Sequence, residues 1–147
     1  MPNSLRRKRG WIKIDDLYDI ADQNDIPVYC YDLPCTGSLS VMDSNGDCYI
    51  GIDPFQISSY AEEKTRLAHE LGHCITGSFY NQYATADDRA RHEYRANRWA
   101  IKKLIPKDEL ERATKSGITE IYELAEYFNV TVDFLRLALW YYQEVST

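Results

Sequence analysis

Residues 66–73 read Arg-Leu-Ala-His-Glu-Leu-Gly-His. It contains the pattern H-E-x-x-H, in which two histidines stand four residues apart and a glutamate follows the first. One residue advances about 100° around a helix, so His69 and His73 lie about 40° apart and one turn above the other. Two imidazoles in that arrangement can bind one Zn²⁺, and Glu70 at the edge of the same face can accept a proton from an attacking water.

The flanking residues place this pattern inside a helix. Ser59 followed by Glu62 predicts a capping box at the start, and Gly77 predicts the end. Gly72 costs about 1 kcal/mol relative to alanine in a helix interior, so it indicates that another element approaches closely. The face opposite the histidines is expected to pack inward through Tyr60, Leu67, Leu71 and Ile75.

A catalytic zinc with two histidines and a water needs a third protein ligand. The next helix is predicted over residues 87–105, with a basic stripe formed by Arg91, Arg95, Arg98 and Lys102. Glu93 lies on another face of that helix, together with Ala96, Asn97, Ala100 and Leu104. A carboxylate on an apolar face is costly unless it meets a cation. Glu93 is therefore the predicted third ligand, and His92, about 100° from that face, is the alternative.

These segments resemble the signatures of the ImmA/IrrE family of small bacterial and phage-encoded zinc metallopeptidases. The resemblance is carried by residues 67–73 (LAHELGH), 93–100 (EYRANRWA) and 104–106 (LIP). It covers most of the chain, is specific at the two helices and is loose before Ile50. Many members have a second acidic residue where Arg95 stands here, so Arg95 removes a competitor of Glu93 for the metal.

The resemblance implies a site and an activity. His69, His73 and Glu93 would hold one Zn²⁺ per chain, and Glu70 would be the catalytic base of an endopeptidase. The implied substrate is an intracellular protein, typically the helix-turn-helix repressor of a phage or mobile element, whose cleavage relieves repression. The alternative is a non-catalytic, metal-stabilised anti-repressor that acts by protein–protein contact.

The expected fold is α+β and zincin-like, with a small sheet packed against the H-E-x-x-H helix. A helix is predicted over residues 15–24, and strands over 28–31, 38–42 and 48–52, the last two joined by a hairpin at Asn45-Gly46. An edge strand of such a sheet can bind substrate in extended form, and the sequence does not decide which strand this is. The connector over residues 76–85 carries Tyr80 and Tyr83, either of which could donate to the developing oxyanion.

Composition and charge favour one cytoplasmic domain. The chain has 147 residues and a net charge of -6, so we expect a single domain over residues 1–147. Residues 1–10 form a basic tail without the apolar stretch of a signal peptide, and no membrane segment is predicted. The four cysteines match no zinc pattern and are interpreted as reduced thiols.

Beyond Pro106 the sequence predicts a helical C-terminal subdomain over residues 107–147, with helices over 107–115, 119–128 and 131–142. Residues 120–131 have the cadence of a helix-turn-helix, but from Gly117 onward Arg136 is the only base among several acids. Phosphate contacts need lysine and arginine, so no nucleic acid is expected as a partner. Core packing is the default role of the apolar residues here, and contact with a partner is the alternative for Phe134, Leu137, Trp140 and Tyr141.

Overall fold

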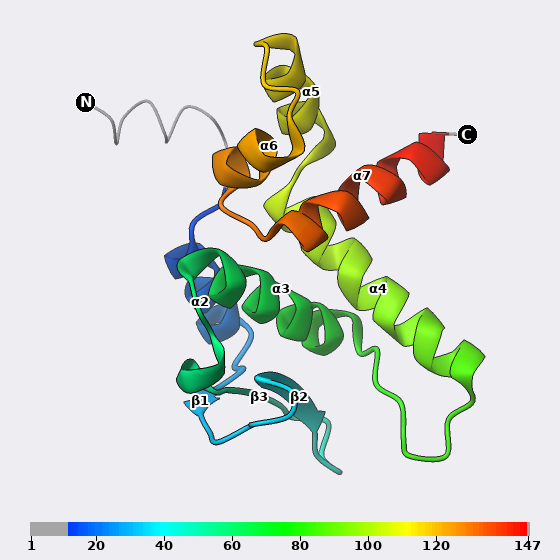
Figure 1. Ribbon diagram of the computed structural model, residues 1–147. Coiled ribbons are helices and arrows are strands. Elements are labelled where there is room, and N and C mark those ends of the chain that lie inside the picture. The colour runs from blue at the N-terminus through cyan, green and yellow to red at the C-terminus, as the bar shows by residue number, and fades with distance from the viewer. Residues whose placement is uncertain (1–11, 147) are drawn as a thin grey trace.

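The strands predicted before residue 53 form one small mixed sheet (Figure 1). In the computed structural model, which describes residues 12–146, β1 (Val28–Cys30), β3 (Cys48–Ile52) and β2 (Ser38–Met42) lie side by side in that order. β1 runs parallel to β3, with Val28 opposite Ile50, and β2 runs antiparallel to β3, with Ser38 opposite Ile52. β2 is therefore an edge strand of the sheet.

Helices account for most of the remaining described chain, and they follow the predicted segments closely. α2 covers one side of the sheet with α3, and α4 crosses α3 (Figure 1). The last helix continues to Ser146, past its predicted end at Tyr142. The helical elements are α2 (Ile14–Gln23), η1 (Pro54–Gln56), α3 (Tyr60–Thr76), α4 (Ala86–Leu104), α5 (Lys107–Lys115), α6 (Ile121–Phe128) and α7 (Val132–Ser146).

The ends of α3 largely match the sequence signals. Ser59 Oγ accepts a hydrogen bond of 3.1 Å from the backbone N–H of Glu62, and Gly77 ends the helix in the left-handed conformation at φ 66°. The predicted capping box forms only by half, because the Glu62 carboxylate accepts hydrogen bonds from Ser58 instead of Ser59.

Leu67 and Leu71 are fully buried in the core, as predicted. Tyr60 and Ile75 are exposed instead, because they lie in the first and last turns of α3, beyond the elements that cover its middle.

Gly72 marks the point where α4 meets α3. A Cβ at this position would clash with the backbone carbonyl of Ala96 on α4. The predicted close approach is therefore confirmed, and the approaching element is the backbone of the second ligand helix. A larger residue would push α4, and the residues it carries, away from α3.

The prediction that all four cysteines are reduced thiols is wrong for two of them. Cys48 on β3 and Cys74 on α3 form a disulfide, with their Cα atoms 5.8 Å apart. Packing of α3 on the sheet brings the two Cα atoms within the range that a disulfide spans, which spacing along the sequence could not reveal. Cys30 and Cys35 are free and exposed.

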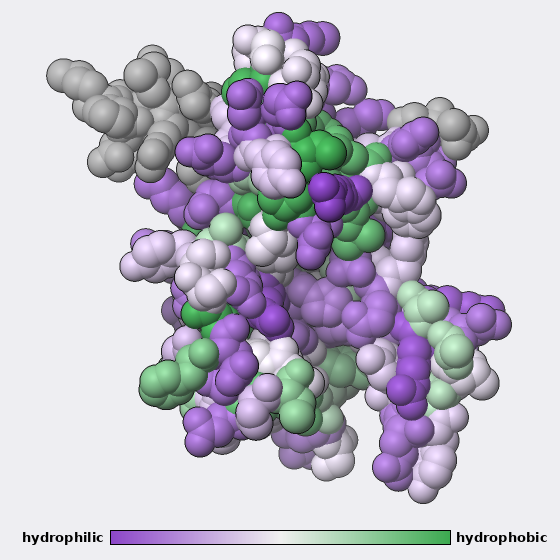
Figure 2. All heavy atoms as spheres, in the orientation of Figure 1, coloured by the Kyte–Doolittle hydropathy of each residue, from purple (hydrophilic) through white to green (hydrophobic). Residues whose placement is uncertain are grey.

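The C-terminal helices share the core with the rest of the described chain. Buried residues of α5, α6 and α7, such as Ala113, Phe128 and Leu135, belong to the same cluster as Leu67 and Leu71 of α3. Figure 2 shows apolar side chains gathered over α6 and α7 on the viewed face. Within residues 12–146, no helix combines the length and apolar character needed to cross a bilayer.

Two of the four residues considered for partner contact are core residues. Phe134 and Tyr141 are buried, whereas Trp140 on the same helix is about half exposed. Lys64 of α3 is also fully buried, and its Nζ donates a hydrogen bond of 2.8 Å to the carbonyl of Phe128 at the end of α6. This bond ties the C-terminal helices to the helix of the H-E-x-x-H pattern.

Candidate metal centre

Three side chains from two helices converge at the middle of α3. His69 and His73 project from α3, and Glu93 projects from α4. The two Nε2 atoms are 3.2 Å apart, and Glu93 Oε2 and Oε1 lie 3.0 and 3.2 Å from the Nε2 atoms of His69 and His73. The structure thus brings together the three residues predicted as metal ligands.

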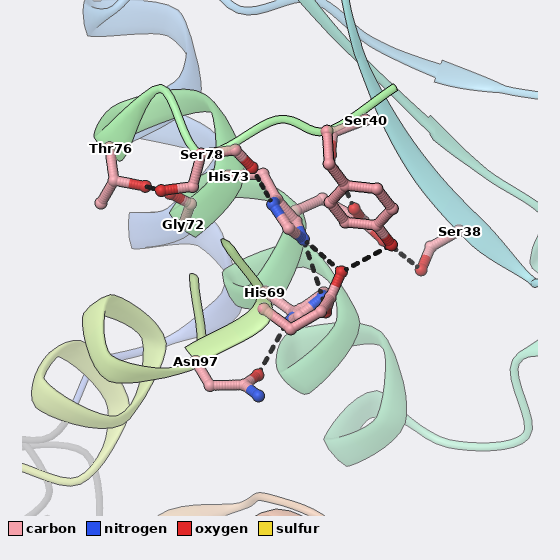
Figure 3. Close-up of polar contacts among 11 residues, drawn as sticks. Ser38, Ser40, His69, Gly72, His73, Thr76, Ser78 and Asn97 are labelled. Atoms are coloured by element: carbon pink, nitrogen blue, oxygen red, sulfur yellow. Dashed lines mark hydrogen bonds and ion pairs between the residues drawn. The ribbon is translucent and has the colours of Figure 1, made fainter. Parts of the chain in front are cut away.

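The other ring nitrogen of each histidine has its own partner (Figure 3). His73 Nδ1 lies 2.5 Å from the backbone carbonyl of Ser78, and His69 Nδ1 lies 2.8 Å from Oδ1 of Asn97. A carbonyl oxygen can only accept, so Nδ1 of each neutral ring carries the proton. Each Nε2 then presents a lone pair towards the other histidine and Glu93.

The acceptor atoms of His69, His73 and Glu93 lie close enough together to share a cation. Two imidazole lone pairs and a carboxylate facing one another at about 3 Å repel unless a positive charge lies between them. A tetrahedral zinc with bonds of about 2.0 Å separates its ligand atoms by about 3.3 Å, close to the distances between Nε2 of His69, Nε2 of His73 and the Glu93 oxygens. The donor set and its spacing therefore fit a divalent metal ion.

The electrostatics of the cluster agree with this geometry. The His69 and His73 rings that face Glu93 hold the pKa of its carboxyl group well below the ordinary value. Burial on its own would lower the pKa of His69, but hydrogen bonding to Glu93 and the negative charges of Glu70 and Glu93 outweigh burial and raise it. The centre of the cluster thus favours positive charge.

Glu70 lies beside this cluster in a hydrogen-bonded and buried position. Its side chain projects from α3 towards β2, where Ser38 Oγ donates to Oε2 at 2.8 Å and Ser40 Oγ donates to Oε1 at 2.9 Å. Residues i and i+2 of a strand share one face, so the two serines reach the same carboxylate. Both oxygens of Glu70 are thus oriented by the edge strand.

The cluster opens into a cleft between β2, α3 and the connector that follows α3. A hollow of about 390 Å³ is lined by Ser38, Ser40, Glu70, Tyr80 and the three cluster residues. An adjoining hollow of about 320 Å³ shares Ser38 and Glu70 with it and extends towards Arg66, Asn97 and Phe134. Together the two hollows run past the cluster on both sides of Glu70.

Of the two connector tyrosines, only Tyr80 reaches the cleft. Its hydroxyl donates a hydrogen bond of 3.1 Å to Glu93 Oε1, whereas Tyr83 is 83% exposed. Burial and the neighbouring Glu93 carboxylate raise the pKa of Tyr80, so its hydroxyl stays protonated and able to donate. His92, the alternative ligand, lies tilted against the Tyr80 ring, with the two ring centroids 6.0 Å apart, and is not part of the cluster.

Ser38, Ser40 and Ser78 were not predicted as site residues. Ser38 and Ser40 carried a usable signal, because a hydroxyl pair at i and i+2 faces inward on a half-buried strand. Ser78 contributes a backbone carbonyl, which no side-chain pattern could reveal. The sequence predicts Asn97 on the same helix face as Glu93, which is correct, but it does not predict the contact of Asn97 with His69.

Residues 57–139 match the family model Peptidase_M78, described as the IrrE N-terminal-like domain. No curated protein matches the chain. Among solved structures, a Mycobacterium tuberculosis transcriptional regulator aligns with a TM-score of 0.59 and 16% identity, over 90% of this chain and 43% of that chain. This likeness shows a shared fold, and the present chain spans less than half of that regulator.

Proposed function

This chain belongs to the Peptidase_M78 family of IrrE N-terminal-like domains, and from that premise we propose that it is a zinc-dependent endopeptidase. His69, His73 and Glu93 would hold the metal, and Glu70 would be the catalytic base. The observation that carries the proposal is the buried Glu70 carboxylate, which lies in the same cleft as the three converging ligand atoms. A purely structural metal site has no need of such a base.

In this proposal, different residues of the chain have different roles in amide hydrolysis. A bound Zn²⁺ would supply Lewis-acid polarisation of the attacking water and of the scissile carbonyl. Glu70 accepts the proton of the water and delivers it to the nitrogen of the leaving amine. Ser38 and Ser40 keep the carboxylate aimed into the cleft. The Tyr80 hydroxyl donates to Glu93, and we propose that it turns its proton to the developing oxyanion during the reaction.

The substrate would bind along β2 in extended form. Leu39 and Val41 pair with β3 at Gly51 and Tyr49, and hydrogen-bonded pairs alternate along an antiparallel ladder. The backbone N–H of Asp53 donates to the carbonyl of Gly37, so alternate residues from Gly37 onward, including Leu39 and Val41, are the ones hydrogen-bonded to β3. The backbone groups of Ser38, Ser40 and Met42 therefore point to the free edge. An added strand there would run past Glu70 and the metal ligands.

The proposed substrate is a helix-turn-helix repressor of a phage or mobile element, cleaved in the cytoplasm so that repression is relieved. We also propose that the α+β arrangement is zincin-like and forms a single domain, which the continuous core of the described residues supports. Inactivation of the repressor by contact alone is the competing function, and the buried base beside the metal ligands favours the peptidase.

The test is hydrolysis of candidate repressor proteins, followed by mass spectrometry of the fragments. Fragments should appear with the zinc-loaded chain, disappear after the metal is chelated and return when Zn²⁺ is restored. Repressor that binds tightly to the zinc-loaded chain and stays intact would contradict the proposed activity.

A further inference from the structure

The sheet has a second, outward-facing surface that the proposed reaction does not use. Ser38 and Ser40 point to α3, so the alternating Leu39 and Val41 point to the opposite face of β2. A hollow of about 530 Å³ lies on that face, and its wall residues are Tyr29, Tyr31, Leu33, Leu39, Val41 and Tyr49. We call it the outer hollow.

The outer hollow is apolar, aromatic and open. Tyr29, Tyr31 and Val41 are 48%, 60% and 48% exposed, although large apolar side chains usually avoid water when they gather on one surface. The Tyr29 and Tyr31 rings meet edge to face at 6.2 Å. Gly51 leaves room for this arrangement, because a Cβ there would lie 3.2 Å from the Tyr31 ring.

The charges around the outer hollow have one sign. Every charged side chain between residues 14 and 63 is an aspartate or a glutamate. Asp32 stands between two residues that line the hollow, and Asp43 accepts a hydrogen bond from the Tyr49 hydroxyl. The hydrogen bond to Asp43 and its negative charge raise the pKa of Tyr49, and the charge of Asp47 adds a smaller effect in the same direction. Within residues 12–146, these three aspartates form no ion pair with lysine or arginine.

Aromatic walls with an acidic rim suit a long cationic side chain. An arginine or lysine can lay its aliphatic stem on Leu39 and Val41 while its charge faces the tyrosine rings and the aspartates. Length matters, because neighbouring strands are about 4.8 Å apart. A residue on a strand added beside β2 must therefore reach across β2 to meet Tyr49 on β3.

The outer hollow and the catalytic cleft are neighbours across a single strand. Leu39 lines both of them, so an extended chain on the free edge of β2 would present alternate side chains to each. We propose that the outer hollow binds an arginine or lysine of the protein substrate, at a position whose side chain points away from the cleft. This inference rests on the proposed binding of substrate along β2, and it defines the substrate class as a basic, extended segment.

The exposed Tyr29 and Tyr31 could also stack the bases of single-stranded nucleic acid. The aspartates around the outer hollow disfavour a phosphate backbone, since phosphate contacts need lysine and arginine. The basic peptide is therefore the occupant that the charges favour.

The experiment measures binding by fluorescence anisotropy with the full chain carrying Glu70→Gln, so that the probe is not hydrolysed. The probe is a short labelled peptide of alternating valine and arginine. The comparison probes are the same peptide with glutamate in place of arginine, and an oligothymidylate. We expect saturable binding of the arginine peptide that weakens with salt, and no comparable binding of the other two.

Two further substitutions in the Glu70→Gln chain locate the binding. Tyr31→Ala and Asp32→Asn should each weaken binding about two- to fivefold, the size of an exposed cation–π contact or surface ion pair. Tyr122→Ala removes a tyrosine on α6 that is at least as exposed as Tyr31 and should leave binding unchanged. Unaltered affinity in both hollow variants, absent binding of the arginine peptide, or equal binding of either comparison probe would overturn the inference. A chain that binds the arginine peptide and hydrolyses no protein would instead contradict the proposed peptidase alone.

Discussion

Ser38 Oγ on the edge strand donates a hydrogen bond of 2.8 Å to Oε2 of the buried Glu70 on α3. The bond joins the strand proposed to hold the substrate to the residue proposed to move the proton. A base whose carboxylate is oriented by hydroxyl groups loses little freedom in the reaction. Loss of a hydrogen bond that orients a metal ligand typically costs about 10- to 100-fold in activity, and we expect a loss at the lower end of that range here.

The first prediction follows from this contact. Ser38→Ala should lower kcat about tenfold with little change in KM or metal content, because it disturbs the base and no metal ligand. Ser38→Thr keeps the hydroxyl and should recover most of the activity. Steady-state hydrolysis with metal analysis checks this, and equal kcat values for the alanine variant and the parent would show that the contact has no positioning role.

The metal assignment predicts different outcomes for two neighbouring residues. Glu93→Ala removes a ligand oxygen that lies 3.0 Å from His69 Nε2, so it should strongly reduce the metal content from about one ion per chain. His92→Ala, one residue away and outside the cluster, should retain the metal. Elemental analysis of the purified variants measures this, and equal metal content in the Glu93→Ala chain and the parent would contradict the assignment.

The contact at Gly72 predicts the sign of a stability change. Helix propensity alone would make Gly72→Ala stabilising by about 1 kcal/mol. The new Cβ would meet the Ala96 carbonyl, and backbone cannot yield as a flexible side chain does, so a net loss of about 1–3 kcal/mol is expected. Denaturant unfolding measures the difference, and a more stable variant would show that α4 packs less closely on α3.

The buried Lys64 predicts how stability depends on pH. Burial lowers the pKa of Lys64 to about 8, although Asp16 acts in the opposite direction, whereas the unfolded chain keeps a value near about 10.4. Between these values the unfolded state binds more protons, so the free energy of unfolding should rise with pH. Above about pH 10, Tyr18 and Tyr142 act oppositely, because burial raises the pKa of each to about 12.

The useful window for Lys64 is therefore about pH 8 to 9.5. Over this window, urea unfolding should show a rise in stability for the parent chain that is absent from Lys64→Met. Lys115→Met, at an exposed position, serves as the control and should behave as the parent does. Parallel pH curves for the parent and Lys64→Met would show that Lys64 keeps its ordinary pKa in the folded chain.

Local signals in the sequence predicted the elements and much of the cluster. The spacing of His69 and His73 places both on one helix face. The cost of an unpaired carboxylate on an apolar face predicted that Glu93 joins them in the cluster. Both arguments need only the geometry of one helix. The strands predicted on either side of the Asn-Gly turn have the bounds that β2 and β3 show in the structure.

The features missed from the sequence depend on which elements meet in space. The Cys48–Cys74 disulfide, the Ser38–Glu70 hydrogen bond and the Ser78 carbonyl beside His73 all join segments whose contact is set by packing. The identity of the edge strand is of the same kind, because the order β1-β3-β2 includes a parallel pairing that no hairpin signal encodes.

Glu70→Gln separates hydrolysis from binding, because it keeps the shape of the side chain and removes the base. Metal content and partner binding should match those of the parent, while repressor fragments, and de-repression in cells, should be lost. If the chain instead works by contact alone, Glu70→Gln will relieve repression as well as the parent does, and neither protein will produce fragments. That result would show that Glu70 is not a catalytic base and that the chain is not a peptidase.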